Sequence, residues 1–146
     1  MCRLSKLNYT NEHLVGQYYV SGYYAVHVSS LFLKQNLIDI LLISETHFTN
    51  TYHYTIPGFD ICYTCHPDGT THEGTAIIIN NTLEYYERPK YAEATLQATS
   101  VTVSGLFYKI TIAAVYCPRR HNLKEEHFKA FFQTLGPRFL AGGFQQ

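Results

Sequence analysis

The stretch from Asp39 to His47 constrains the fold of this chain more than any other segment of its 146 residues. Its apolar run, Ile40-Leu41-Leu42-Ile43, is too short to cross a bilayer and is bounded by polar residues. Such a run predicts a strand that is buried on both faces of a sheet. The strand would deliver the carboxylate of Glu45 to the carboxyl edge of the sheet, where open α/β sheets usually place their chemistry.

Composition indicates a globular chain without a general affinity for nucleic acid. Hydrophobic residues make up 46% of the sequence and aromatic residues 15%, which excludes an intrinsically disordered chain. Lys and Arg total 11, and so do Asp and Glu, so no global basic field draws the chain to phosphates. A role with nucleic acid would therefore need a local basic patch.

The N-terminal sequence predicts an intracellular protein, cytoplasmic or nuclear and not secreted. The first twenty residues lack the apolar core and small-residue cleavage site of a signal peptide. No run approaches the roughly 20 apolar residues of a membrane helix, so no membrane partner is expected. Without an oxidising compartment, the four thinly spread cysteines are expected to be free thiols: Cys2, Cys62, Cys65 and Cys117.

Patterning predicts two domain parts, a loose N-terminal arm over residues 1–17 and one domain over residues 18–146. Within the domain, a short helix over 31–35 precedes the buried strand at 37–44. Two further strands, 60–64 and 74–79, are linked by the turn sequence His66-Pro67-Asp68-Gly69 and are expected to be antiparallel.

The second half of the chain predicts a hairpin and a helix. The segment 96–103 has the two-residue period of a strand with one solvent-exposed face, and the chain turns at Gly105 into a strand at 108–116. Pro89 confines 83–91 to an edge or a loop. A helix over 123–135, capped by Asn122, precedes the start of another strand at 138.

Two residues at the ends of buried strands are candidates for chemistry. Glu45 fits a hard cation such as Mg²⁺, which binds through one or two carboxylates and keeps several waters. The alternative is a solvated carboxylate in a loop. Tyr116 ends the strand that begins at 108, and its hydroxyl suits a phosphate oxygen that gains charge in a transition state. A packed core aromatic is the alternative for Tyr116.

Two other clusters point less directly to a site. Cys62 and Cys65, followed by His66 and His72, suggest zinc, but adjacent Cys65 and His66 on a strand would point in opposite directions. A thioredoxin-like motif would have to open a helix, so neither zinc nor redox chemistry is expected. A local basic cluster follows Tyr116 and is either a solvated loop or a phosphate-backbone contact: Arg119, Arg120, His121 and Lys124.

Four segments together resemble the endonuclease/exonuclease/phosphatase domain of non-LTR retrotransposons of the jockey type. They are Ile40–His47, His72–Ile79, Ala114–Pro118 and Ala141–Gly143, in that order. The resemblance implies an α/β (α+β) four-layer sandwich of mostly antiparallel sheets flanked by helices, and a Mg²⁺-dependent activity that nicks DNA. It matches Glu45 to the metal-binding Glu and Tyr116 to the Tyr that supports the scissile phosphate. It assigns no residue to an organic cofactor.

The sequence departs from that family at other catalytic positions. Ser21 stands where the first strand of the family ends in a metal-site Asn, and Gly143 is followed by Phe144 and Gln145 without the Asp and Asn of Gly-Asp-Phe-Asn. The family's later strands and terminal Asp-His pair are not found before Gln146. Mg²⁺ is therefore expected to bind weakly, and nuclease turnover is expected to be lost.

Three functions follow from these features. The first is a degenerate, truncated retroelement endonuclease domain with DNA as its partner. The second is an active phosphoesterase of the same fold, and the third is a non-catalytic module that binds nucleic acid or protein. Truncation would also leave an apolar sheet face and an unpaired edge exposed, which favours self-association.

Overall fold

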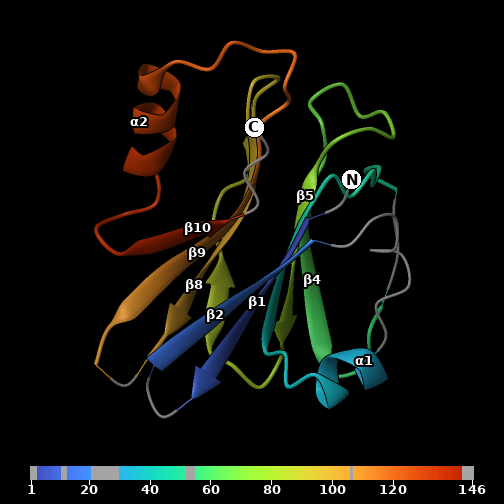
Figure 1. Ribbon diagram of the computed structural model, residues 1–146, viewed down its shortest axis with the longest axis vertical. Coiled ribbons are helices and arrows are strands. Elements are labelled where there is room, and N and C mark those ends of the chain that lie inside the picture. The colour runs from blue at the N-terminus through green and yellow to red at the C-terminus, as the bar shows by residue number, and fades with distance from the viewer. Residues whose placement is uncertain (1–2, 11–12, 21–29, 52–54, 106, 143–146) are drawn as a thin grey trace.

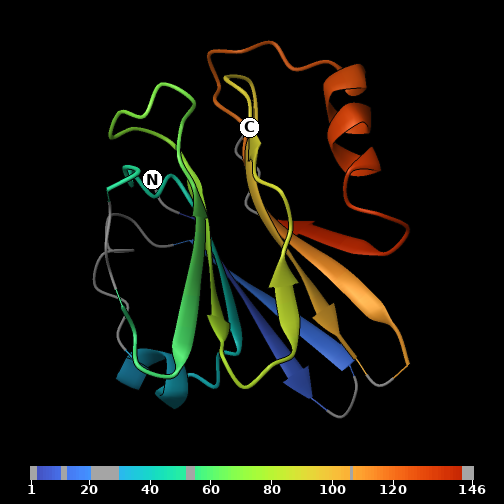
Figure 2. The same cartoon turned by 180° about the vertical axis from the view of Figure 1, so that it is seen from behind.

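The computed structural model describes residues 3–10, 13–20, 30–51, 55–105 and 107–142. In these residues two sheets pack face to face, and a helix lies on the outer side of each (Figures 1 and 2). Neighbouring strands are antiparallel except β9 and β10, which are parallel. The predicted mixed α/β class with mostly antiparallel sheets is confirmed.

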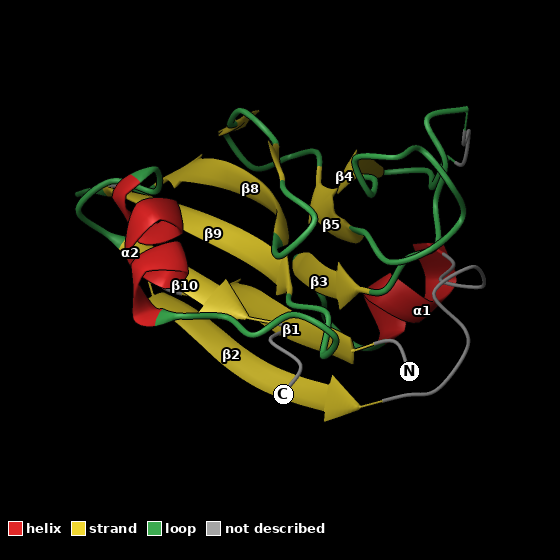
Figure 3. Ribbon diagram, turned by 90° about the horizontal axis from the view of Figure 1, so that it is seen from above, coloured by secondary structure: helices red, strands yellow, loops and turns green. Residues whose placement is uncertain are grey.

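The first sheet has the order β2-β1-β3-β5-β4 and the second β10-β9-β8-β6, with β7 also paired to β8. Viewed from above, the two sheets form adjacent layers (Figure 3). The first sheet contains β1 (Arg3–Thr10), β2 (His13–Val20), β3 (Ile40–Ser44), β4 (Phe59–Thr64) and β5 (Thr75–Asn80). The second contains β6 (Tyr85–Glu87), β7 (Tyr91–Ala92), β8 (Gln97–Ser104), β9 (Lys109–Tyr116) and β10 (Phe139–Gly142). The helices are α1 (Ser30–Gln35) and α2 (Glu125–Gln133).

The structure corrects the predicted loose arm over residues 1–17. The described residues of this range form β1 and most of β2, two antiparallel strands in which Arg3 pairs with Val20 and Thr10 with His13. Strand β1 also pairs with β3, so the proposed boundary at residue 17 falls inside β2 and inside the first sheet. The local pattern is weak, and the hydrogen-bonding edge of the buried strand β3 supplies the reason for these residues to be extended.

Strand β3 is buried on both faces, as its sequence predicts. Ile40 and Leu42 face the second sheet, while Leu41 and Ile43 pack on the opposite face with Leu33 of α1. The strand lies between β1 and β5 in its sheet. Its burial fixes the point at which the chain emerges as Glu45.

Three apolar clusters separate the helix and sheet layers. The cluster between the sheets contains Ile40, Leu42, Cys62, Ile77, Ile79, Val101, Val103, Ile112 and Ala114. The cluster under α2 contains Leu96, Ala98, Ala113, Val115, Cys117, Phe131 and Leu135. Each of β3 and β9 therefore contributes alternate side chains to two clusters, which fixes its register against slippage.

The prediction that the strand at 96–103 has one solvent-exposed face is wrong. Every residue of β8 from Gln97 to Val103 is buried, because one face meets the first sheet and the other lies toward α2. Its hydroxyls are satisfied internally instead: Thr102 and Thr111 are hydrogen bonded across the hairpin at 3.0 Å. The Thr residues that alternate with Val are therefore hydrogen bonded inside the protein and do not face solvent.

Helix α2 begins later than predicted. Its N-cap is Lys124, not Asn122, and the Lys124 backbone N–H donates to Nδ1 of His127 at 2.9 Å. A His at this third helical position thus does what Glu or Gln does in the usual capping box. No helix in the described part of the chain is long and apolar enough to cross a membrane.

The described cysteines are free, as predicted, while Cys2 lies outside the described residues. Burial raises the pKa of the Cys62 thiol to about 12 and that of Cys117 to about 11. Burial also raises the pKa of Cys65. These thiols stay protonated and enclosed at neutral pH.

We expect Cys62, Cys65 and Cys117 to react slowly with a thiol reagent at pH 8 in the folded Cys2→Ser variant, and rapidly in urea, because thiolate is the reactive form. Absorbance of the released chromophore would measure this. Three thiols that react rapidly without denaturant would contradict the described packing.

The raised thiol pKa values also make stability depend on pH. The thiols of Cys62 and Cys117 contribute fully to the free energy of unfolding below the pKa of an unfolded thiol. This contribution falls as the pH rises through about 11 and about 12.

Candidate functional site

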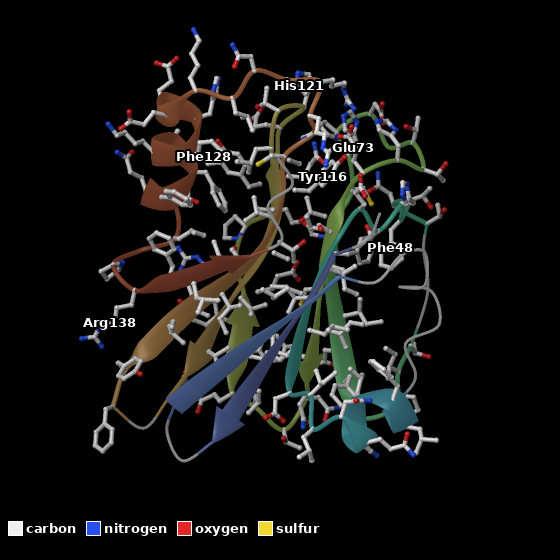
Figure 4. The ribbon with its side chains drawn as sticks, in the orientation of Figure 1. Phe48, Glu73, Tyr116, His121, Phe128 and Arg138 are labelled. Atoms are coloured by element: carbon white, nitrogen blue, oxygen red, sulfur yellow. The ribbon has the colours of Figure 1, made fainter. Side chains whose placement is uncertain are left out.

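Glu45 and Tyr116 meet at one edge of the two sheets. Glu45 follows β3 in the first sheet, and Tyr116 is the last residue of β9 in the second. The Tyr116 hydroxyl donates a hydrogen bond to Oε1 of Glu45 at 2.9 Å, across 71 residues of sequence. Figure 4 places Tyr116 at the upper end of the molecule, close to Glu73. The two candidate residues, each found at the end of a buried strand, therefore contact each other.

Backbone conformation is unusual on both loops of this edge. Glu45, His47 and Glu73 have φ of 58°, 57° and 59°, in the left-handed region that non-glycine residues rarely adopt. Such conformations concentrate at functional sites, where the surrounding structure must hold them. Here the holding contacts are backbone hydrogen bonds, from Thr46 N–H to the Gly74 carbonyl at 3.3 Å and from His47 N–H to the Glu73 carbonyl at 2.9 Å.

Gly74 is required where these loops meet. Its φ is +86°, and a Cβ there would lie 2.9 Å from both Thr46 Oγ1 and the Thr64 carbonyl oxygen. Any larger residue would push the loops apart, and the loop before β5 could then no longer contact the one after β3. The glycine thus sets the position of Glu73 relative to Glu45.

Tyr116 is a neutral hydrogen-bond donor at this edge. Burial is the main cause that raises its pKa above the ordinary value, followed by its hydrogen bond to Glu45 and the nearby charges of Glu45 and Glu73. The side chain is 7% exposed. A donor held protonated in this way can stabilise a negative oxygen without giving up its proton.

An ion pair between the buried Glu73 and the half-exposed Arg120 lies beside the Glu45–Tyr116 pair and was missed in the sequence. Glu73 is only 4% exposed, and its Oε1 accepts a hydrogen bond from Arg120 Nη1. Its other oxygen lies 3.4 Å from His66 Nε2. The position of Glu73 could have been found, although its partner could not: β3 and β5 are antiparallel, so the end of β3 and the start of β5 lie at the same end of the sheet.

The basic cluster after Tyr116 is divided by this ion pair. All three cations Arg119, Arg120 and Lys124 are exposed, but Arg120 is ion-paired with Glu73. Only part of the cluster therefore remains available to an external phosphate.

Threonines link the sheets below this edge. Their hydroxyls form one directed chain: Thr75 to Thr99 at 2.9 Å, Thr99 to Thr64 at 2.9 Å, and Thr64 to the Ala98 carbonyl at 3.1 Å. Each hydroxyl in this order donates once, which satisfies buried polar groups that would otherwise be destabilising. The fully buried Gln97 adds a contact at 3.4 Å, where its Oε1 accepts the Gly74 N–H.

The described residues offer Mg²⁺ one carboxylate at this edge. Oε1 of Glu45 accepts the Tyr116 hydroxyl, and the Glu73 carboxylate is held by Arg120. The described group of three metal-binding side chains is formed elsewhere, by His66, Asp68 and His72. The departures at Ser21 and at 143–145 lie outside the described residues. Because Mg²⁺ dehydrates reluctantly, one carboxylate makes a poor site, and no catalytic step is assigned to the metal.

Sequence comparison finds relatives among proteins of mobile elements. The chain is 31% identical over 113 residues to the RNA-directed DNA polymerase from mobile element jockey of Drosophila melanogaster, and 27% identical to its counterpart in Drosophila funebris. It is 30% identical over 114 residues to a probable RNA-directed DNA polymerase from transposon X-element of Drosophila melanogaster. The chain is homologous to a segment of mobile-element polymerases.

The homologous segment is short relative to these proteins. Each match covers 77% of this chain and 12% of the relative's length, so the chain spans about an eighth of the proteins it resembles. No protein-family model matches the chain. No solved structure matches it.

Proposed function

We propose that this chain is an endonuclease/exonuclease/phosphatase-type domain of a mobile element that retains a DNA-facing site and lacks efficient turnover. The observation that carries the proposal is the hydrogen bond between Tyr116 and Glu45. These two residues were matched to the family's phosphate-supporting Tyr and metal-binding Glu, and they meet although 71 residues separate them. The layering of helix, sheet, sheet and helix supports the same fold.

The relatives support a mobile-element origin without specifying the chemistry. Their names describe RNA-directed DNA polymerases, an activity stated for those whole proteins. The endonuclease part of the proposal rests on the four segments of sequence resemblance and on the geometry of the edge. A phosphoesterase with a small substrate would need the same carboxylate and hydroxyl, so the edge alone does not favour it over a nuclease.

Weak turnover follows from the residues that accompany the pair. Ser21 stands where the family has an Asn, and Gly143 is followed by Phe144 and Gln145 without the Asp and Asn of Gly-Asp-Phe-Asn. A water-activating carboxylate and a second metal ligand are therefore missing from those positions. Catalytic groups that act as a unit lose most of their effect when some are removed, so the remaining pair contributes little acceleration by itself.

Plasmid nicking in Mg²⁺ tests this proposal. We expect the protein to convert supercoiled DNA to open circles no faster than its Glu45→Gln variant, because the metal is held by one carboxylate. Gel electrophoresis over a time course measures the rate. Nicking by the unaltered chain that disappears in Glu45→Gln would overturn the claim of lost turnover.

A second candidate, a non-catalytic nucleic-acid module, is favoured by the exposed cations Arg119 and Lys124, which follow Tyr116 in the chain. Fluorescence anisotropy with a DNA duplex at several salt concentrations would test it in the same samples. Arg119→Gln or Lys124→Gln should each lower the slope of log K against log salt by about 1 if that side chain contacts a phosphate. Binding that does not depend on salt would exclude this candidate.

A further inference from the structure

The loop between β4 and β5 gathers two imidazoles around one carboxylate. His66, Asp68 and His72 each offer a ligand atom, and the three atoms lie within 4.8 Å of one another. His66 Nδ1 is 3.0 Å from Asp68 Oδ1, and His72 Nε2 is 3.5 Å from Asp68 Oδ2. Ligand atoms around a tetrahedral Zn²⁺, with bonds of about 2.0–2.2 Å, are roughly 3.3–3.5 Å apart. The loop is thus near the required spacing.

Hydrogen bonds within the loop show which nitrogen of His72 carries the proton. Thr70 Oγ1 donates its single hydrogen to Asp68 Oδ1 at 2.8 Å, because a carboxylate can only accept. Thr70 Oγ1 must then accept from Nδ1–H of His72, with which it is in close contact. In the neutral ring this leaves the lone pair on Nε2, the atom that faces Asp68.

His66 is oriented in the matching way. Its Nδ1 faces Asp68, at 3.2 Å from the backbone nitrogen and 3.0 Å from the carboxylate Oδ1. Its Nε2 lies 3.4 Å from the buried Glu73 carboxylate. Two imidazole nitrogens and a carboxylate thus converge, and a cation between them would be attracted by the carboxylate and coordinated by both rings. Coordination would replace the contact of Nδ1 with the backbone nitrogen.

The Asp68 carboxylate is oriented by its neighbour. Its Oδ1 accepts hydrogen bonds from the Thr70 backbone N–H and from Thr70 Oγ1, both at 2.8 Å. The His66 side chain is only 9% exposed, so packing fixes the orientation of its ring. The pattern in which one ring nitrogen faces the ligand position and the other faces a carboxylate is usual for histidines that bind metal.

We propose that His66, Asp68 and His72 bind a divalent transition-metal ion, with Zn²⁺ as the best fit. Two imidazoles and one carboxylate suit Zn²⁺, and three protein ligands leave the fourth position to water. Neither Cys62 nor Cys65 takes part, because both thiols are buried in apolar clusters. The site is separate from the Glu45–Tyr116 pair and does not depend on the proposed nuclease origin.

The bound ion would brace the loop that carries Glu73. The loop turns at Gly69, whose N–H donates to the His66 carbonyl at 2.9 Å, and it returns to β5 through Glu73 and Gly74. An ion that joins His66 to His72 closes this loop at its base. It would therefore restrain Glu73 through His66, which is a metal ligand and also contacts the Glu73 carboxylate. Glu73 is in turn ion-paired with Arg120.

Cobalt titration of the chain, purified without a polyhistidine tag and stripped with a chelator, tests the site. We expect visible absorption bands of four-coordinate Co²⁺ that saturate at one ion per chain and vanish when Zn²⁺ is added. His72→Gln and Asp68→Asn should each weaken binding at least tenfold. Asp68 is exposed and His72 is only partly buried, so these variants are expected to fold.

His127→Gln is the matched control. It removes an imidazole from α2, away from the loop, and places a usual capping-box residue at the same helical position. Its Co²⁺ affinity should equal that of the unaltered chain. Hydrogen exchange of residues 65–74 should also slow when Zn²⁺ is added, and only where the loop ligands are intact. Absence of stoichiometric binding, or equal weakening by His127→Gln and His72→Gln, would overturn the proposal.

Discussion

Replacing Arg120 with methionine should lower the free energy of unfolding by about 2–4 kcal/mol. The variant leaves the Glu73 carboxylate, whose side chain is 5% exposed, without its guanidinium partner. Removing one member of a buried pair usually costs about 3–5 kcal/mol, and the 52% exposure of Arg120 reduces the expected loss. Urea unfolding followed by far-ultraviolet circular dichroism would measure it, since the chain has no Trp for fluorescence.

Arg119→Met is the control, because Arg119 is exposed and adjacent, and the described residues show no ion pair for it. Its effect should stay within about 0.5 kcal/mol. In a double-mutant cycle with Glu73→Gln, the coupling to Arg120 should be at least about 1 kcal/mol. Equal destabilisation by Arg119→Met and Arg120→Met would show that the ion pair contributes nothing specific.

The ion pair could not be predicted from the sequence because no local pattern says which cation turns inward. Arg120 and Glu73 are 47 residues apart, and Arg119 offers the same charge one position earlier. Only the close approach of the two loops, set by Gly74 and the left-handed Glu73, selects Arg120. Sequence reasoning found the basic cluster but gave Arg120 no partner within the protein, and the ion pair with Glu73 supplies one.

Glu45 and Tyr116 could be predicted because their strands are unambiguous. The run Ile40–Ile43 and the apolar end of β9 leave few options other than burial on both faces. Each residue then emerges where its strand ends. The edge shared by the two sheets follows from this placement, although the 2.9 Å hydrogen bond also requires the turn of the backbone at Glu45.

Strands β1 and β8 show where sequence patterns mislead. Alternation of Thr and Val in β8 is typical of a strand with one solvent-exposed face, but the hydroxyls of Thr99 and Thr102 form hydrogen bonds inside the protein. Residues 3–10 lack a clear period, and pairing with β3 makes them extended. In both strands tertiary pairing decides the outcome, and tertiary pairing is not visible in a local window.

Phe131→Ala should be the most destabilising single change, with a loss of about 3–5 kcal/mol. Phe131 is 1% exposed and is the main residue by which α2 covers the outer face of the second sheet. Its ring meets Tyr91 edge-on at 5.0 Å between centroids. Truncation removes these contacts and opens a cavity that a helix joined to two sheet strands can only partly close. Urea unfolding would give both the free energy and its denaturant dependence.

Phe132→Ala is the comparison, since Phe132 is only half-buried and stacks on Phe139 at 5.2 Å between centroids. It should cost roughly half as much, because less apolar area leaves water. If both changes cost the same, α2 does not dock through Phe131. The segment from β9 to α2 also carries Arg120, so undocking should weaken the pair with Glu73. A cycle between Phe131→Ala and Arg120→Met should then be non-additive, and additive losses would show that the ion pair holds independently of α2.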